Sequence, residues 1–89
     1  MHCDIRQNGS VFTSFLNIDK SYNDRIILIR SASKTFNTAG LKNAYIVCQN
    51  KEFLKRIDRQ VNINEICDVT SFGVAATIAA YTQCDDWIV

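Results

Sequence analysis

Several features that would assign a chain to a common functional class are missing from this sequence. It has no proline and only 3 glycines among 89 residues. It also shows no linker, low-complexity stretch or internal repeat, so nothing in it marks a domain boundary. The formal net charge of +1 lacks the basic excess of nucleic-acid-binding proteins, and no apolar run approaches the length of a membrane span. We therefore expect neither a nucleic-acid partner nor a membrane partner.

Metal ligands are also sparse. The cysteines are scattered, at Cys3, Cys48, Cys67 and Cys84, and His2 is the only histidine. Because zinc sites normally use closely spaced ligand pairs, we expect no metal site and interpret the cysteines as reduced, partly buried thiols. The N-terminal residues show no basic region followed by an apolar core, and we expect a cytoplasmic protein.

Hydrophobic residues nevertheless make up 47% of the chain, too much for a disordered tail, and two apolar runs predict strands. Arg25–Arg30 is rich in β-branched residues and predicts a strand covered on both faces. After the polar segment Ser31–Gly40, Ala44–Cys48 predicts a second short, buried strand. Before them, residues 1–10 carry turn signals, and residues 17–24 predict a loop or a weak helical turn.

Two helices are predicted after the second strand. Asn50 is a suitable N-cap for the first helix. The apolar residues that recur in it at helical spacing are Phe53, Leu54, Ile57 and Val61. Its other sides carry Lys51, Lys55, Arg56 and Arg59. We interpret this basic face as solvated rather than as a phosphate or nucleic-acid patch. Thr70 or Ser71 caps a second, alanine-rich helix that reaches Tyr81.

The predicted order of strand, polar loop, strand, helix and helix indicates an α/β fold. It supplies only about two strands, and a sheet that small rarely stands alone. The apolar runs therefore require neighbours that this sequence does not contain.

One segment carries candidate chemistry. Ser31–Leu41 places Lys34 among hydroxyl groups directly after the first predicted strand, and ligands of open α/β sheets bind at the carboxyl ends of strands. A partly desolvated lysine can lose its proton and form a Schiff base with a carbonyl compound. Ser31, Ser33 and Thr35 offer donors for a phosphate group. On these grounds alone, a solvated loop residue remains the ordinary interpretation of Lys34.

The segment Ser33–Leu41 has the sequence SKTFNTAGL. It resembles the lysine motif of fold-type I enzymes that depend on pyridoxal 5'-phosphate (PLP). Within the class I/II aminotransferase family, the likeness is to the cystathionine β-lyase and C–S lyase branch. His2–Asp4 resembles the end of that branch's Asp-Glu-Ile-His-x-Asp segment, and Ala80–Trp87 resembles its Ala-Tyr…Asp-Trp-Leu segment. The resemblance implies that residues 1–89 are an α/β, partial three-layer fragment of the large PLP-binding domain of a fold-type I aminotransferase. The C-terminal small domain would be absent.

The resemblance also implies a chemistry. Lys34 would hold PLP through a Schiff base and then move the α-proton of an amino-acid substrate, while the cofactor takes up electrons. In the C–S lyase branch, a thiol leaves from the β-carbon of a sulfur amino acid. In the aminotransferase branch, an amino group passes between amino and keto acids instead. The motif favours the lyase, and relatives of full length form homodimers with sites at the interface.

Further cofactor-binding residues follow from the same resemblance. Ser31 stands where related aminotransferases often have a phosphate-binding serine. Ser33 belongs to the lyase-type motif and would either serve the phosphate or order the loop. Lys42 stands where many relatives have an arginine, and it would act as a point charge without the bidentate fork. His2 would lie near the 3′-oxygen of the cofactor, or would be a frayed terminal residue.

Other residues of the family's site fall outside the chain. The aspartate that pairs with the pyridine nitrogen precedes the position of His2, where this chain has Met1, and Asp4 is not at that motif position. The stacking aromatic residue and the arginine for the substrate carboxylate are also missing. We therefore expect the isolated chain to be catalytically weak or inactive. The alternative of another class is a non-catalytic module that binds a partner through Trp87, Ile88 and the alanine-rich helix.

Overall fold

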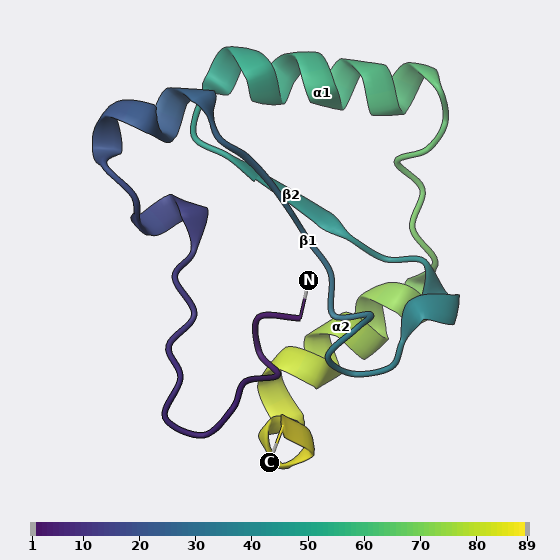
Figure 1. Ribbon diagram of the computed structural model, residues 1–89. Coiled ribbons are helices and arrows are strands. Elements are labelled where there is room, and N and C mark those ends of the chain that lie inside the picture. Colours follow the sequence, from purple (N-terminus) through teal and green to yellow (C-terminus); the bar gives the residue numbers. More distant parts are fainter. Residues whose placement is uncertain (1, 89) are drawn as a thin grey trace. The chain divides into compact units, whose positions relative to one another are not determined.

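The computed structural model of the protein describes residues 2–88, which form a small mixed α/β structure. The strands are β1 (Ile27–Arg30) and β2 (Tyr45–Cys48), and the α-helices are α1 (Lys51–Ile63) and α2 (Ser71–Gln83) (Figure 1). The short 3-10 helices are η1 (Phe15–Asn17), η2 (Lys20–Arg25), η3 (Ala39–Leu41) and η4 (Asp85–Ile88). The predicted order of strand, polar loop, strand, helix and helix is confirmed.

The chain folds as two compact units, each built from separate stretches of sequence. The lysine unit, named for Lys34, comprises the chain up to Phe12, Arg30–Tyr45 and the chain from Val69 onwards. The α1 unit comprises Thr13–Ile29 and Ile46–Asp68. Because neither unit is continuous in sequence, no shift in composition along the chain marks where one ends and the other begins.

The strands β1 and β2 pair in a two-stranded sheet and run in opposite directions (Figure 1). The strand predicted over Arg25–Arg30 begins only at Ile27, because Arg25 ends η2. The predicted coverage of both faces is wrong for the described residues, since Ile27 is 47% exposed and Ile29 60% exposed. The predicted burial of the second strand is wrong in the same way, as Tyr45 is 41% exposed. So small a sheet lacks the further strands that a buried sheet needs.

Helix α1 begins where its sequence predicts. The Asn50 Oδ1 accepts hydrogen bonds from the backbone N–H groups of Glu52 and Phe53, at 3.0 and 3.1 Å, which satisfies donors that the first turn leaves free. The Asn50 amide also donates to the Asp24 carbonyl at 2.9 Å. Apolar residues of α1 and Ile27 line an open groove of about 420 Å³ within the α1 unit. The basic side chains of α1 are exposed, as predicted.

Helix α2 starts at one of the two predicted caps. The Thr70 Oγ1 accepts the backbone N–H of Gly73 at 2.9 Å, and the Thr70 hydroxyl donates to the Leu41 carbonyl at 3.3 Å. Gly73 is buried because α2 approaches the chain closely there: an added Cβ would lie 2.9 Å from the Leu41 carbonyl oxygen. Gly73 therefore allows this close approach because it has no side chain. Within residues 2–88, neither α-helix has the length and apolar character needed to cross a bilayer.

Candidate functional site

Lys34 lies in a compact turn, residues 32–38, that follows β1. We call this segment the lysine turn. The turn is closed by backbone hydrogen bonds from Phe36 N–H to the Ala32 carbonyl at 2.9 Å and from Thr38 N–H to the Ser33 carbonyl at 3.1 Å. Ala32 is buried, whereas the Lys34 side chain is exposed. The turn is therefore anchored in the lysine unit by a buried residue, while the side chain of Lys34 remains accessible.

Asn37 completes this turn in the left-handed backbone region, with φ of 55°. Asparagine tolerates that region better than most residues because its short side chain hydrogen-bonds locally. Lys42, which ends η3, also has a left-handed backbone, with φ and ψ both 51°. The connection between β1 and β2 thus reverses direction without using glycine at either position.

Ser31 ties the start of the turn to the segment that precedes β2. Its buried hydroxyl donates to the Asn43 carbonyl at 2.6 Å and accepts the Ser33 backbone N–H at 3.1 Å. The Asn43 side chain in turn donates to the Gly73 carbonyl at 2.9 Å and to Thr77 Oγ1 at 2.8 Å. This chain of hydrogen bonds connects the lysine turn to α2.

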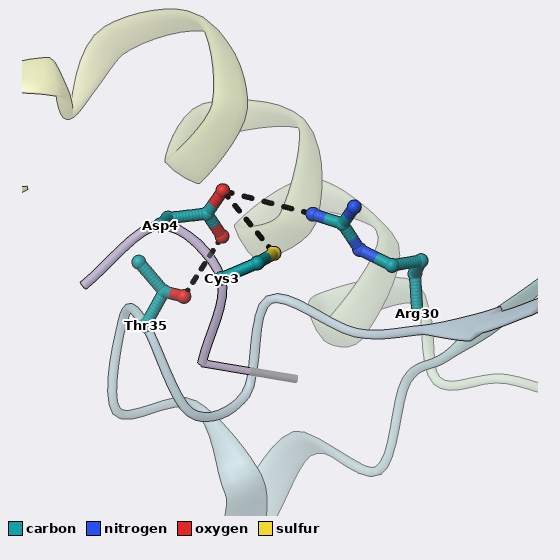
Figure 2. Close-up of polar contacts among 4 residues, drawn as sticks. All are labelled: Cys3, Asp4, Arg30 and Thr35. Carbon is teal, nitrogen blue, oxygen red and sulfur yellow. Dashed lines mark hydrogen bonds and ion pairs between the residues drawn. The ribbon is translucent and has the colours of Figure 1, made fainter. Parts of the chain in front are cut away.

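Thr35, the residue after Lys34, is the most constrained member of the turn, with 3% of its surface exposed. Its hydroxyl donates to Asp4 Oδ2 at 2.9 Å (Figure 2). Its carbonyl accepts the indole N–H of Trp87 at 2.7 Å. Asp4 also lies 3.6 Å from Arg30 Nη2. The lysine turn is therefore held by residues from both ends of the chain.

A cavity of about 420 Å³ opens beside the turn, within the lysine unit. It is lined by Ile5, Lys34, Thr35, Asn37, Trp87 and Ile88. This volume falls in the range of small-molecule and cofactor sites. Trp87, which is 62% exposed, gives the cavity an aromatic surface. A primary amine, an amide and an indole thus border one space large enough for a small ring compound.

Aromatic packing supports the other side of the turn. The Phe36 ring meets Tyr81 edge to face, with centroids 5.7 Å apart, and Tyr81 meets Tyr45 at 6.5 Å. Such geometry is favourable for aromatic pairs. Partial desolvation of Tyr81, together with the neighbouring Tyr45 hydroxyl, raises the pKa of Tyr81 to about 12. Its hydroxyl therefore keeps its proton well into the alkaline range.

The predicted site residues are distributed unevenly around this cavity. Lys34 borders it. Ser31 and Ser33 are joined by a hydrogen bond from the Ser33 backbone N–H to the Ser31 hydroxyl, and neither is among the residues that line the cavity. Lys42 and His2 are both exposed, and neither borders the cavity. The cofactor roles of all five residues remain predictions.

The sequence did not identify Asp4 and Trp87 as supports of the turn, and it assigned Thr35 differently. The Thr35 hydroxyl, predicted as a phosphate donor, is instead bound to Asp4, 31 positions away. Trp87, predicted as apolar surface, is exposed but uses its N–H on a carbonyl 52 positions away. No local pattern signals contacts across such separations, because they depend on how the segments are brought together.

Comparison with known proteins gives one similarity. No family model matches the chain. Over 88 residues, the chain is 26% identical to "Cystathionine beta-lyase PatB" of Bacillus subtilis (strain 168). The aligned region covers 99% of this chain but 23% of that protein, so the chain spans less than a quarter of its length. The chain is therefore similar to one region of a cystathionine β-lyase, at a low level of identity.

Proposed function

We propose that this chain is the cofactor-lysine region of a PLP-dependent C–S lyase that acts on sulfur amino acids, with Lys34 as the point of attachment. The observation that carries the proposal is that Lys34, in the turn directly after a strand, lines a cavity of about 420 Å³. The SKTFNTAGL segment and the similarity to a cystathionine β-lyase support it. A complete enzyme of this kind would be a homodimer.

Residues at the cavity, and others in the connection between β1 and β2, would hold the cofactor. Lys34 supplies the amine, and Trp87 supplies an aromatic surface beside it. Among residues 2–88, the Ser33 hydroxyl has no hydrogen-bond partner, whereas the Ser31 hydroxyl donates to Asn43 at 2.6 Å. Ser33 is therefore the better phosphate donor of the two, and Lys42 adds positive charge to the same connection. When bound, PLP supplies an electron sink for amino-acid chemistry.

Lys34 would perform two tasks. Its Nζ would hold the cofactor. The same Nζ would serve as the base for the α-proton of the substrate, placed within reach of the reacting carbon. The exposed side chain of Lys34 beside the buried Thr35 suits both tasks, since the backbone is held while the amine stays free to move.

The test is covalent trapping. The chain is incubated with PLP, reduced with borohydride and mapped by mass spectrometry, while a visible absorbance band is followed before reduction. We expect the adduct mainly at Lys34, and we expect Lys34→Ala to abolish both the band and this adduct. Lys55→Ala, at an exposed lysine of α1, is the matched control and should retain the adduct at Lys34. An equal band in wild type and Lys34→Ala, or no band in wild type, would remove Lys34 from this role.

The aminotransferase alternative uses the same lysine and differs only in the fate of the substrate. A second class of function, a binding module, is favoured by exposed apolar side chains such as Ile29 in the α1 unit and Ile78 in the lysine unit. Size measurement in solution separates it from the enzyme fragment. A defined oligomer that forms without PLP and gives no Lys34 adduct would favour the module.

A further inference from the structure

The contacts of Asp4 are not explained by cofactor attachment itself. One carboxylate oxygen of Asp4 accepts the Thr35 hydroxyl at 2.9 Å. The other lies 3.6 Å from Arg30 Nη2 and accepts the Cys3 thiol at 3.6 Å. In Figure 2 the carboxylate stands between Thr35 on one side and Arg30 on the other. Asp4 thus joins the residue after Lys34 to the last residue of β1.

This arrangement constrains the direction of the Lys34 side chain. Thr35 is buried, so its hydroxyl needs a partner, and a carboxylate acceptor makes a stronger bond than a neutral one. The Trp87 N–H holds the carbonyl of the same residue at 2.7 Å. With the hydroxyl and the carbonyl of Thr35 both held, the backbone that carries Lys34 has little freedom to rotate. The Lys34 amine can then move at the end of its side chain while the backbone that carries it stays in place.

We propose that Asp4 is a positioning residue for Lys34, which acts through the Thr35 hydroxyl to aim the amine into the cavity. The inference rests on the proposed function, and it adds a residue that contacts neither the cavity amine nor a cofactor. Arg30 keeps the Asp4 carboxylate oriented toward Thr35. Loss of the Asp4–Thr35 bond loosens the turn, and a displacement of the amine by about 1 Å is enough to slow a reaction strongly.

The experiment measures selectivity rather than total reactivity. Each variant is treated with PLP and borohydride, and the ratio of adduct at Lys34 to adduct at Lys55 is followed over time and pH. Lys55 is exposed on α1 and corrects for concentration and general amine reactivity. We expect Asp4→Ala to lower the ratio on the order of tenfold. Thr35→Val, which keeps the side-chain shape, should lower it similarly, and the double variant should add little more.

Two controls separate positioning from a loss of stability. Thr35→Ser retains the hydroxyl and should keep the wild-type ratio. Asp86→Ala removes an exposed carboxylate from the same unit and should leave the ratio unchanged. An unchanged ratio in both Asp4→Ala and Thr35→Val, with wild type still selective for Lys34, would overturn the positioning role alone. A wild-type chain that shows no preference for Lys34 over Lys55 would overturn the proposed function, and the positioning role with it.

Discussion

The side-chain hydrogen bonds of the lysine unit and of the α1 unit differ in the sequence separation of their partners. In the lysine unit, side chains bond to groups 29 to 52 positions away, as in Asn43 to Thr77 and Trp87 to Thr35. In the α1 unit, side-chain hydrogen bonds are mostly made within four positions, as in Asn62 to Asp58. The exception is the bond from Asn50 to the Asp24 carbonyl.

The unit that contains the candidate site is therefore the one whose geometry depends on hydrogen bonds between residues far apart in the sequence. A local cap forms wherever a suitable residue precedes a helix, so α1 requires little from the rest of the chain. The lysine turn needs Asp4, Asn43 and Trp87 to arrive at the same place. Substitutions in the lysine unit should therefore cost more stability than comparable substitutions in the α1 unit.

The largest effect is expected at Gly73, where α2 meets the connection before β2. Alanine usually stabilises a helix relative to glycine, but here its Cβ would lie 2.9 Å from both the Leu41 carbonyl oxygen and Thr70 Oγ1. We expect Gly73→Ala to lower the free energy of unfolding by about 1–3 kcal/mol, measured by chemical denaturation. Gly40→Ala, where nothing lies within 4 Å, is the control and should not destabilise. Equal stabilisation by both alanines would show that the close approach does not exist.

A direct comparison of the units uses two asparagines. Asn43→Ala removes two side-chain hydrogen bonds that reach α2, and we expect it to cost about 1–3 kcal/mol of unfolding free energy. Asn50→Ala removes the cap of α1 together with an exposed bond to the Asp24 carbonyl, and we expect a cost of about 1 kcal/mol. Gln49→Ala, at an exposed neighbour of the cap, should leave stability unchanged. A larger cost at Asn50 than at Asn43 would reverse the comparison.

The smallest effect concerns alkaline pH. Burial raises the pKa of Tyr81 from 10.0 to about 12, so the folded chain keeps a proton that the unfolded chain loses first. The stabilising contribution is therefore complete below about pH 10 and declines as pH rises toward 12. Ultraviolet titration should show a late tyrosinate component that is absent from Tyr81→Phe, and this variant should lose less stability over that interval. Coincident titration curves for the two proteins would contradict the burial of this hydroxyl.

The sequence predicted the secondary-structure elements more accurately than the burial of their side chains. Apolar spacing and Asn50 predicted α1 correctly, and Thr70 was one of two predicted caps for α2, because caps and helical periodicity are local properties. The two-sided burial of β1 was wrong, since β-branched composition predicts what a strand prefers and not which neighbours it receives. For the candidate site, the motif singled out Lys34, whose role stays a prediction, while no local pattern indicated that Asp4 and Trp87 hold the turn.

By itself, the sequence determined the order of the elements, the cap of α1 and the polar segment that carries Lys34, and it narrowed the cap of α2 to Thr70 or Ser71. Each of these depends on residues within a few positions of one another. Only the tertiary structure decided that Asp4 and Trp87 hold Thr35 and that Gly73 lies against the Leu41 carbonyl. Those contacts join segments far apart in the chain. Hydrogen bonds over such separations form only after folding has brought both partners together.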